Sequence, residues 1–300
     1  MRKLSLVRLR NTIIGMILLV FSGQTNALTI NTTFAGGAAP GSAVGPGNVQ
    51  DIFGTAADWW ESAILDPFTL NLTFQWGALG GGTLGLHQLQ TQAGGRETSG
   101  LITFDNDGTT DWWLDGTPAD ASEFSTFTES SADLGGGLIN TGRVYTGATG
   151  LAVGNFDLFN TAIHEIGHAL GMSSANFSYQ GESWPDNDVD VAAPLPFAGT
   201  VIQTRNGNTP ETGATSNAHF LTAAHPNATL GRVVSRGSRY MLTCVDILAN
   251  AQISGFSNID CDPDLVSVPE PGTIGLIGLG LLGLAFSRRR SRYSQAAKSR

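Results

Sequence analysis

Two histidines one helical turn apart, with a glutamate directly after the first, are the residues of this chain best suited to chemistry. The segment reads His164-Glu165-Ile166-Gly167-His168. On an α-helix, residues four apart share a face, so both imidazoles can reach one zinc ion while Glu165 lies about 100° further round. Zinc acidifies a bound water and polarises a carbonyl, and a carboxylate in reach can take the proton and deliver it to a leaving amine. The spacing predicts peptide-bond hydrolysis, with Glu165 as catalytic base and acid.

The residues around this motif indicate the helix that must present it. An apolar stripe of Ile163, Ile166 and Leu170 lies opposite the histidines. Asn155 or Asp157 can cap the start of the helix, and Gly171 can end it. The alternative is an ordinary amphipathic helix with two surface histidines, which would make the glutamate, the caps and the spacing coincidental.

The N-terminal segment has the pattern of a secretory signal peptide. Four basic residues precede the apolar run Ile13–Phe21, and Thr25-Asn26-Ala27 follows. This order predicts that residues 1–27 are removed on export. The apolar run is short for the alternative, an N-terminal membrane anchor.

The C-terminal segment carries a second export signal. Pro269-Glu270-Pro271 precedes the apolar run Thr273–Phe286, and Arg288–Arg290 follow. This order resembles the PEP-CTERM sorting signal of Gram-negative bacteria, over residues 268–292. The resemblance implies translocation, transient retention in the inner membrane with the arginines inside, cleavage by an exosortase, and a final place at the cell surface or outside the cell. The positive-inside rule gives the same orientation, and the short, glycine-rich run argues against a permanent anchor.

Residues 28–267 remain as the predicted metallopeptidase domain, about 240 residues, enough for one domain or for two lobes around a cleft. Six arginines and no lysine stand against 24 acidic residues in this segment. Such a charge excludes nucleic acid and anionic membrane surfaces as partners. Cys244 and Cys261 are the only cysteines, and in an oxidising compartment they can form one disulfide between the last helix and the loop after it.

Hydrophobic periodicity predicts an α+β fold. We expect helices over Val49–Ile64 and Leu242–Ser254, strands over Thr69–Trp76 and Leu101–Phe104, and a sheet edge at Asp111–Asp115. Glycine-rich connections are expected over residues 130–155, and a mostly irregular lobe after Gly171. An extended peptide substrate is expected to pair with an edge strand near Leu101–Asp115.

The motif helix resembles that of the zincin metallopeptidases. His-Glu-Ile-Gly-His-Ala-Leu-Gly-Met, from His164 on, looks like the metzincin branch, in a leishmanolysin-like or matrixin-like form. The resemblance implies an N-terminal helix and mixed sheet, the zinc helix, and an irregular C-terminal lobe with a closing helix. Most metzincins place the third zinc histidine where this chain has Ser174. A leishmanolysin-like variant takes it from far downstream, and His219-Phe220 resembles that pair. At the Met-turn position stands Gly231, and Met241 is too far along.

The third zinc ligand therefore stays open at this point. His164, His168 and His219 are the predicted set, His225 is the rival, and Asp186, Asp188 or no protein ligand are further alternatives. His87 is expected to lie on the surface. Two acidic clusters could hold structural calcium, although neither fits the EF-hand register. They are Asp105, Asp107, Asp111 and Asp115, and Asp186, Asp188 and Asp190.

Together these patterns predict an exported, zinc-dependent endopeptidase that acts on protein or peptide substrates. The alternative from another class is a non-catalytic, zinc-binding protein of the cell surface or biofilm matrix, which Ser174 and the missing methionine would allow. Glu165 argues against it, because a structural zinc site needs no base and fills its fourth position with a protein ligand. A third possibility is another amide, such as peptidoglycan, as the substrate.

Overall fold

The computed structural model describes residues 27–205, 218–231 and 234–263. The chain divides into two compact units, Met1–Pro263 and Asp264–Arg300, and every described residue belongs to the first. The predicted signal peptide, apart from residue 27, and the predicted sorting segment lie outside the described residues. Within the described ranges, no helix has the length and apolar character needed to cross a membrane.

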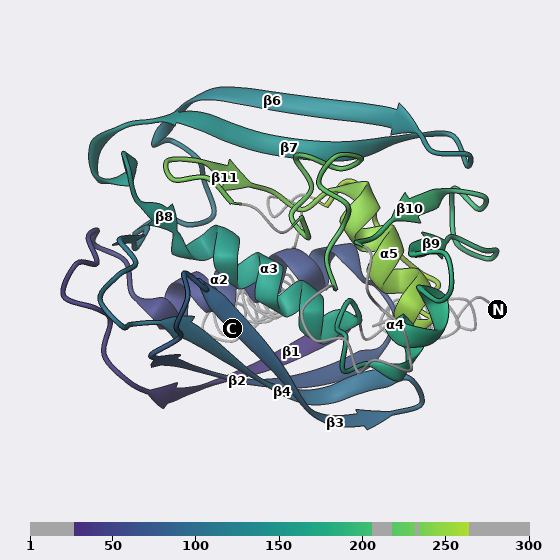
Figure 1. Ribbon diagram of the computed structural model, residues 1–300, viewed down its shortest axis with the longest axis horizontal. Helices are drawn as coiled ribbons and strands as arrows, with labels where there is room; N and C mark the ends of the chain where they lie inside the picture. The colour runs from purple at the N-terminus through teal and green to yellow at the C-terminus, as the bar shows by residue number, and fades with distance from the viewer. Residues whose placement is uncertain (1–26, 206–217, 232–233, 264–300) are drawn as a thin grey trace, which may run out of the picture. The chain divides into compact units, whose positions relative to one another are not determined.

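A four-stranded mixed sheet forms the base of the fold (Figure 1). Its strands are β1 (Leu28–Gly36), β2 (Phe68–Gly77), β4 (Arg96–Asp105) and β3 (Gly85–Ala93), in that spatial order. β3 is antiparallel to β4, and the other pairings are parallel. The strands predicted around Thr69–Trp76 and Leu101–Phe104 are confirmed. The predicted edge is wrong, because β4 lies between β2 and β3, so that β3 is the edge strand next to the motif helix.

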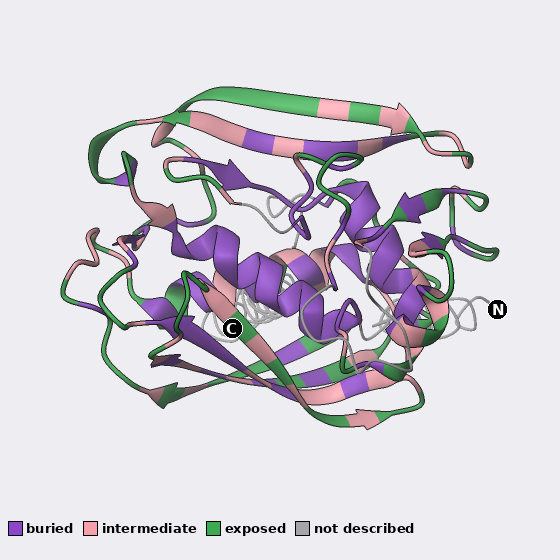
Figure 2. Ribbon diagram, viewed as in Figure 1, coloured by how far each residue is buried: buried purple, intermediate pink, exposed green. Residues whose placement is uncertain are grey.

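Two helices pack on this sheet and against each other. α2 (Val49–Ala63) begins at Asn48, whose side chain accepts a hydrogen bond from the Asp51 amide. α3 (Leu158–Leu170) begins at Asp157, whose side chain accepts from the Phe159 amide, and it ends at Gly171. The Trp60 indole of α2 donates to the Ile163 carbonyl of α3 at 2.9 Å. Figure 2 shows that α3 is buried along its whole length, so its helical form is held by packing on every side.

A second sheet lies on the other side of the helices in Figure 1. It contains β6 (Phe124–Asp133), β7 (Leu138–Ala148) and β11 (Arg239–Tyr240) in the order β6-β7-β11. The prediction of mere connections over residues 130–155 is therefore wrong. β6 is rich in Ser and Thr and exposed on most of its residues, so it lacks the apolar alternation that marks a half-buried strand (Figure 2).

The predicted sheet edge at Asp111–Asp115 is a two-residue strand, β5 (Trp112–Trp113), which pairs with β8 (Phe156–Asp157) just before α3. The short 3₁₀ helix Gly150–Ala152 precedes β8. Asp157 and Asp115 form ion pairs with Arg239 of β11, each at 2.6 Å, and all three side chains are buried. Arg239 also donates to the carbonyls of Pro118 and Asp120. This cluster fixes the start of α3.

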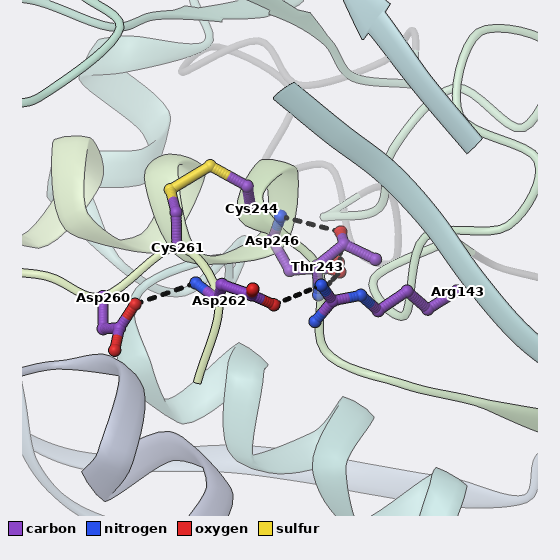
Figure 3. The surroundings of a disulfide bond; sticks show 7 residues. All are labelled: Arg143, Thr243, Cys244, Asp246, Asp260, Cys261 and Asp262. Carbon is purple, nitrogen blue, oxygen red and sulfur yellow. Dashed lines mark hydrogen bonds and ion pairs between the residues drawn. A yellow bond between two sulfur atoms is a disulfide. The ribbon is translucent and has the colours of Figure 1, made fainter. Parts of the chain in front are cut away.

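The C-terminal lobe is less irregular than predicted. It contains α4 (Phe177–Glu182), the pair β9 (Asp188–Asp190) and β10 (Val201–Gln203), and the closing helix α5 (Cys244–Ser254). A capping box of Thr243 and Asp246 starts α5, and Cys244 is bonded to Cys261 (Figure 3). Beside the disulfide, Arg143 of β7 forms an ion pair with Asp262. The predicted closing helix is confirmed, the disulfide that the sequence left open is formed, and the fold is α+β, as expected.

Candidate metal centre

Three imidazoles meet at the middle of the molecule. His164 and His168 come from the same face of α3, and His219 comes from the lobe 55 residues after His164. The Nε2 atom of His164 lies 3.0 Å from that of His168 and 3.2 Å from that of His219. Among the described residues, this is the one group of three or more His, Cys, Asp or Glu side chains whose ligand atoms all lie within 4.8 Å of one another.

Backbone carbonyls fix which nitrogen of the two helix histidines carries the proton. His164 Nδ1 lies 2.7 Å from the Thr229 carbonyl oxygen, and His168 Nδ1 lies 2.6 Å from that of Met172. A carbonyl oxygen only accepts, so each Nδ1 is the donor, and in a neutral ring each Nε2 then has a lone pair. Burial lowers the pKa of both rings, that of His168 well below its ordinary value, which keeps them neutral.

The Nε2 lone pairs of His164 and His168 face each other at 3.0 Å and repel unless a cation lies between them. Zn²⁺ prefers imidazole nitrogen ligands, and a second hydrogen bond at Nδ1 is the usual support of a metal-bound histidine. The donor set therefore fits zinc. No other His, Cys, Asp or Glu side chain of the described ranges joins the three imidazoles, so water or a substrate would complete the coordination of a zinc ion held there.

The lobe holds His219 through its backbone. The Arg205 amide donates to the His219 carbonyl at 3.0 Å, and the Phe220 amide donates to the Leu230 carbonyl at 3.0 Å. Phe220 is fully buried, whereas His219 is half-buried. Backbone hydrogen bonds at His219 and at the next residue therefore hold this segment in place, and the His219 ring points toward His164 of α3.

The other candidates for third ligand lie elsewhere. His225 is buried, its Nε2 accepts from the Gln203 amide at 3.2 Å, and burial lowers its pKa to about 4. The Ser174 carbonyl accepts from the Gln180 side chain at 2.7 Å. Asp186 and Asp188 are not part of the histidine group. Of the predicted alternatives, only His219 comes together with the helix histidines.

The carboxylates of the two acidic clusters do not converge on one point in the described residues. In the first cluster, Asp115 is bound to Arg239 and Asp111 pairs with Arg236. Asp105 is buried and accepts from the Leu79 amide and the Thr110 hydroxyl. Structural calcium stays a prediction without support from this geometry.

Glu165 is buried against the edge strand β3. A Cβ atom built on Gly85 would lie 2.5 Å from Glu165 Oε1, so this glycine makes room for the carboxyl group. The His87 amide donates a hydrogen bond to that group, but burial has the larger effect and raises the pKa of Glu165 to about 8. A carboxyl group with a pKa near neutrality can both take up and release a proton.

His87 is not on the surface, contrary to the prediction. Its side chain is 2% exposed, and Nε2 lies 2.8 Å from the buried carboxyl group of Glu97. The ring stacks toward that of His168, with 6.5 Å between the centroids. Strand alternation from Gly85 could have revealed this, because His87 lies two residues further on the same face of β3.

The turn that faces the histidine helix contains Leu230 rather than a methionine. A Cβ atom built on Gly167 would lie 2.6 Å from Leu230 Cδ2, so the glycine between the two histidines lets this side chain pack on α3. The Met241 carbonyl accepts from the Thr229 hydroxyl at 2.7 Å. Sequence reasoning missed both Thr229 and Leu230, because only the fold brings them to α3.

A comparison with models of protein families matches residues 267–290 to the PEP-CTERM protein-sorting motif. The motif indicates a protein that is exported and sorted by an exosortase in a Gram-negative bacterium, which confirms the tag predicted from the sequence. No curated protein and no solved structure matches the chain.

Proposed function

We propose that this protein is an exported, zinc-dependent endopeptidase. The observation that carries the proposal is the convergence of the three Nε2 atoms with a buried carboxyl group on the next residue of the same helix. His164, His168 and His219 would hold the ion. A zinc ion held by three imidazoles polarises a substrate carbonyl and makes water more acidic.

In this proposal Glu165 is the catalytic residue that moves protons. As a carboxylate it takes a proton from the attacking water, and as an acid it delivers that proton to the leaving amine. The His87 amide and the space above Gly85 fix its position at β3. The non-catalytic alternative gives no reason for a proton-exchanging group at this place.

The edge strand β3 is the surface on which an extended substrate would lie. β3 pairs with β4 on one side and is an edge of its sheet in the described part of the chain. Backbone groups on an open edge can pair with an added strand. Because α3 contacts β3, a peptide paired with that edge would lie close to Glu165.

The proposal is tested with Glu165→Gln in the exported protein. Loss of the base should lower kcat/KM on an unfolded protein substrate by a factor of about 10²–10⁴. The variant should still bind one zinc per chain, because Glu165 is not a ligand. The matched control is Glu182→Gln, which changes a half-buried carboxyl group on α4 and should keep full activity. A metal chelator should abolish activity and added zinc should restore it. Full activity of Glu165→Gln would refute the mechanism.

We also propose the export route in more detail. The chain would pause in the inner membrane, with Arg288–Arg290 in the cytoplasm, and an exosortase-type protease would cut it near Pro269-Glu270-Pro271. The apolar run between them is short and carries four glycines, so it is a weak permanent anchor. Mass spectrometry of the mature protein should find no peptide from residues 273–300. Recovery of these residues in the extracellular form would contradict the route.

A further inference from the structure

The closing helix α5 carries a row of buried polar side chains on one face. Asp246, Asn250 and Ser254 follow each other at intervals of four residues, and all three are buried. Residues at this spacing lie one above the other along a helix. Buried polar groups need partners, so the partners of this row show what the face of α5 does.

Asp246 holds the segment that supports His164. Its carboxyl oxygens accept from the amides of Thr229 at 3.2 Å and Leu230 at 2.8 Å. They also accept from the amide of Thr243 at 3.0 Å and from its hydroxyl at 2.5 Å (Figure 3). The Thr229 carbonyl is the acceptor for His164 Nδ1. The Leu230 carbonyl accepts from Phe220, the neighbour of His219.

Asn250 holds the segment that supports His168. Its Oδ1 accepts from the Met172 amide at 3.1 Å, and its Nδ2 donates to the Asp246 carbonyl at 3.2 Å. The Met172 carbonyl is the acceptor for His168 Nδ1. Ser254 differs from both, because its hydroxyl donates to the Leu170 carbonyl, which receives no histidine proton in any described contact.

We propose that Asp246 and Asn250 are positioning residues of the metal centre: each fixes the backbone segment whose carbonyl orients one helix histidine. The inference rests on the proposed zinc site and extends it to the helix farthest along the described chain. Support of this kind sets the ring orientation and the tautomer of a metal-bound histidine, and its loss weakens metal binding. If α5 only closed the core, all three polar residues of the row would matter alike for folding, and none for the histidines.

The test uses the metal-free full chain with ¹⁵N-labelled histidine. Asp246→Asn places an amide donor where Oδ2 accepts from Thr229 and Thr243, and Asn250→Leu leaves the Met172 amide without its acceptor. We expect Asp246→Asn to lose the slowly exchanging Nδ1–H signal of His164 and keep that of His168. Asn250→Leu should do the reverse. Ser254→Ala, the matched control on the same face, should keep both signals.

A second measurement is the zinc affinity, by competition with a chelator. Asp246→Asn and Asn250→Leu should each bind zinc roughly 10–100-fold more weakly, and Ser254→Ala within about twofold of the wild type. Circular dichroism shows whether each variant is folded. If Asp246→Asn does not fold, Asn250→Leu decides the question, since an unchanged His168 signal together with unchanged zinc affinity would overturn the proposal.

Failure of this inference and failure of the proposed function give different results. A wild-type chain that binds no zinc would end the proposed function, whereas the two Nδ1–H signals of the metal-free chain would still report on Asp246 and Asn250. A wild-type chain that binds zinc, with both variants at wild-type affinity and with both signals present, would overturn the positioning role alone.

Discussion

Buried carboxyl groups flank α3 at two sites, and the two sites are neutralised in different ways. At the start of the helix, Asp115 and Asp157 meet the guanidinium of Arg239, which is itself fully buried. Beside the histidines, Asp246 instead accepts hydrogen bonds from three amides and one hydroxyl. The first site joins charges that are unstable alone in a low-dielectric interior. The second uses a carboxyl group to gather backbone donors.

This difference separates two tasks. Arg239 ties the first turn of α3 to β5 and β11, so it decides whether the helix is in place. Asp246 holds Thr229, whose carbonyl accepts from His164, and Leu230, whose carbonyl accepts from the residue after His219. It therefore decides where the ring nitrogens of these histidines point. Damage to the first should therefore appear as lost stability, and damage to the second as lost metal affinity.

The largest effect is expected from Arg239→Met. Without the guanidinium, two carboxyl groups remain buried, and burial already raises the pKa of Asp157 despite its cationic partner. Removing one partner of a buried ion pair costs about 3–5 kcal/mol. The free energy of unfolding, measured with denaturant, should fall by that amount, while the folded fraction keeps its zinc affinity.

Arg236→Met is the matched control for this prediction. Arg236 also pairs with an aspartate, Asp111, but both side chains are largely exposed. An exposed pair contributes about 1 kcal/mol or less, so this variant should be nearly as stable as the wild type. Equal stability losses in the two variants would break the comparison between buried and solvated clusters.

A smaller effect, on the metal alone, is expected from His219→Ala. The loss of one of three imidazoles should remove several of the roughly 10–16 kcal/mol that a structural zinc site can supply, and lower zinc affinity at least tenfold. His225→Ala is the matched control, since it removes a buried imidazole of the same lobe that packs edge-on against Phe220. His225→Ala should unfold more easily and bind zinc as the wild type does. Weak zinc binding by His225→Ala, together with wild-type affinity of His219→Ala, would show that His225 is the third ligand.

Local sequence was enough to predict much of the site's framework. The spacing of His164 and His168, the cap at Asp157 and the apolar stripe of α3 all involve residues within about four turns of one helix. The same holds for α2, for β2 and for the capped helix α5. In each case the deciding pattern lies inside the element itself.

The predictions that failed, and the contacts that were missed, depend on residues far apart in the chain. The order of strands in the sheet places β3 rather than β4 at the edge, and no periodicity within β4 contains that information. β6 forms although its side chains are polar, because it pairs with β7. Asp246 and Asn250 meet Thr229 and Met172, which lie 17 and 78 residues earlier. A capping residue and a helix-face asparagine look ordinary until those partners are known.

The smallest effect is expected from a third group of carboxylates, which extends the comparison of how carboxyl groups are neutralised. Asp186, Asp188 and Asp190 lie near Glu182, and these carboxylates do not converge on one point in the described part of the chain. Burial, followed by the neighbouring carboxylates, raises the pKa of Asp188 to about 6 from its ordinary value of 3.8. Among the described residues, neither a cation nor a set of amides offsets this repulsion.

The sign of the pH dependence follows from that shift. The folded chain holds the Asp188 proton more tightly than the unfolded chain, so the group favours folding below about pH 4, and this advantage is lost as the pH rises through 6. Asp188→Asn removes the repulsion. Its melting temperature should exceed that of the wild type by roughly 1–3 °C at pH 8 and match it at pH 4. If the cluster instead binds calcium, millimolar calcium will stabilise the wild type at pH 8 and the variant will lose that gain, because a bound cation turns the repulsion of these carboxylates into attraction.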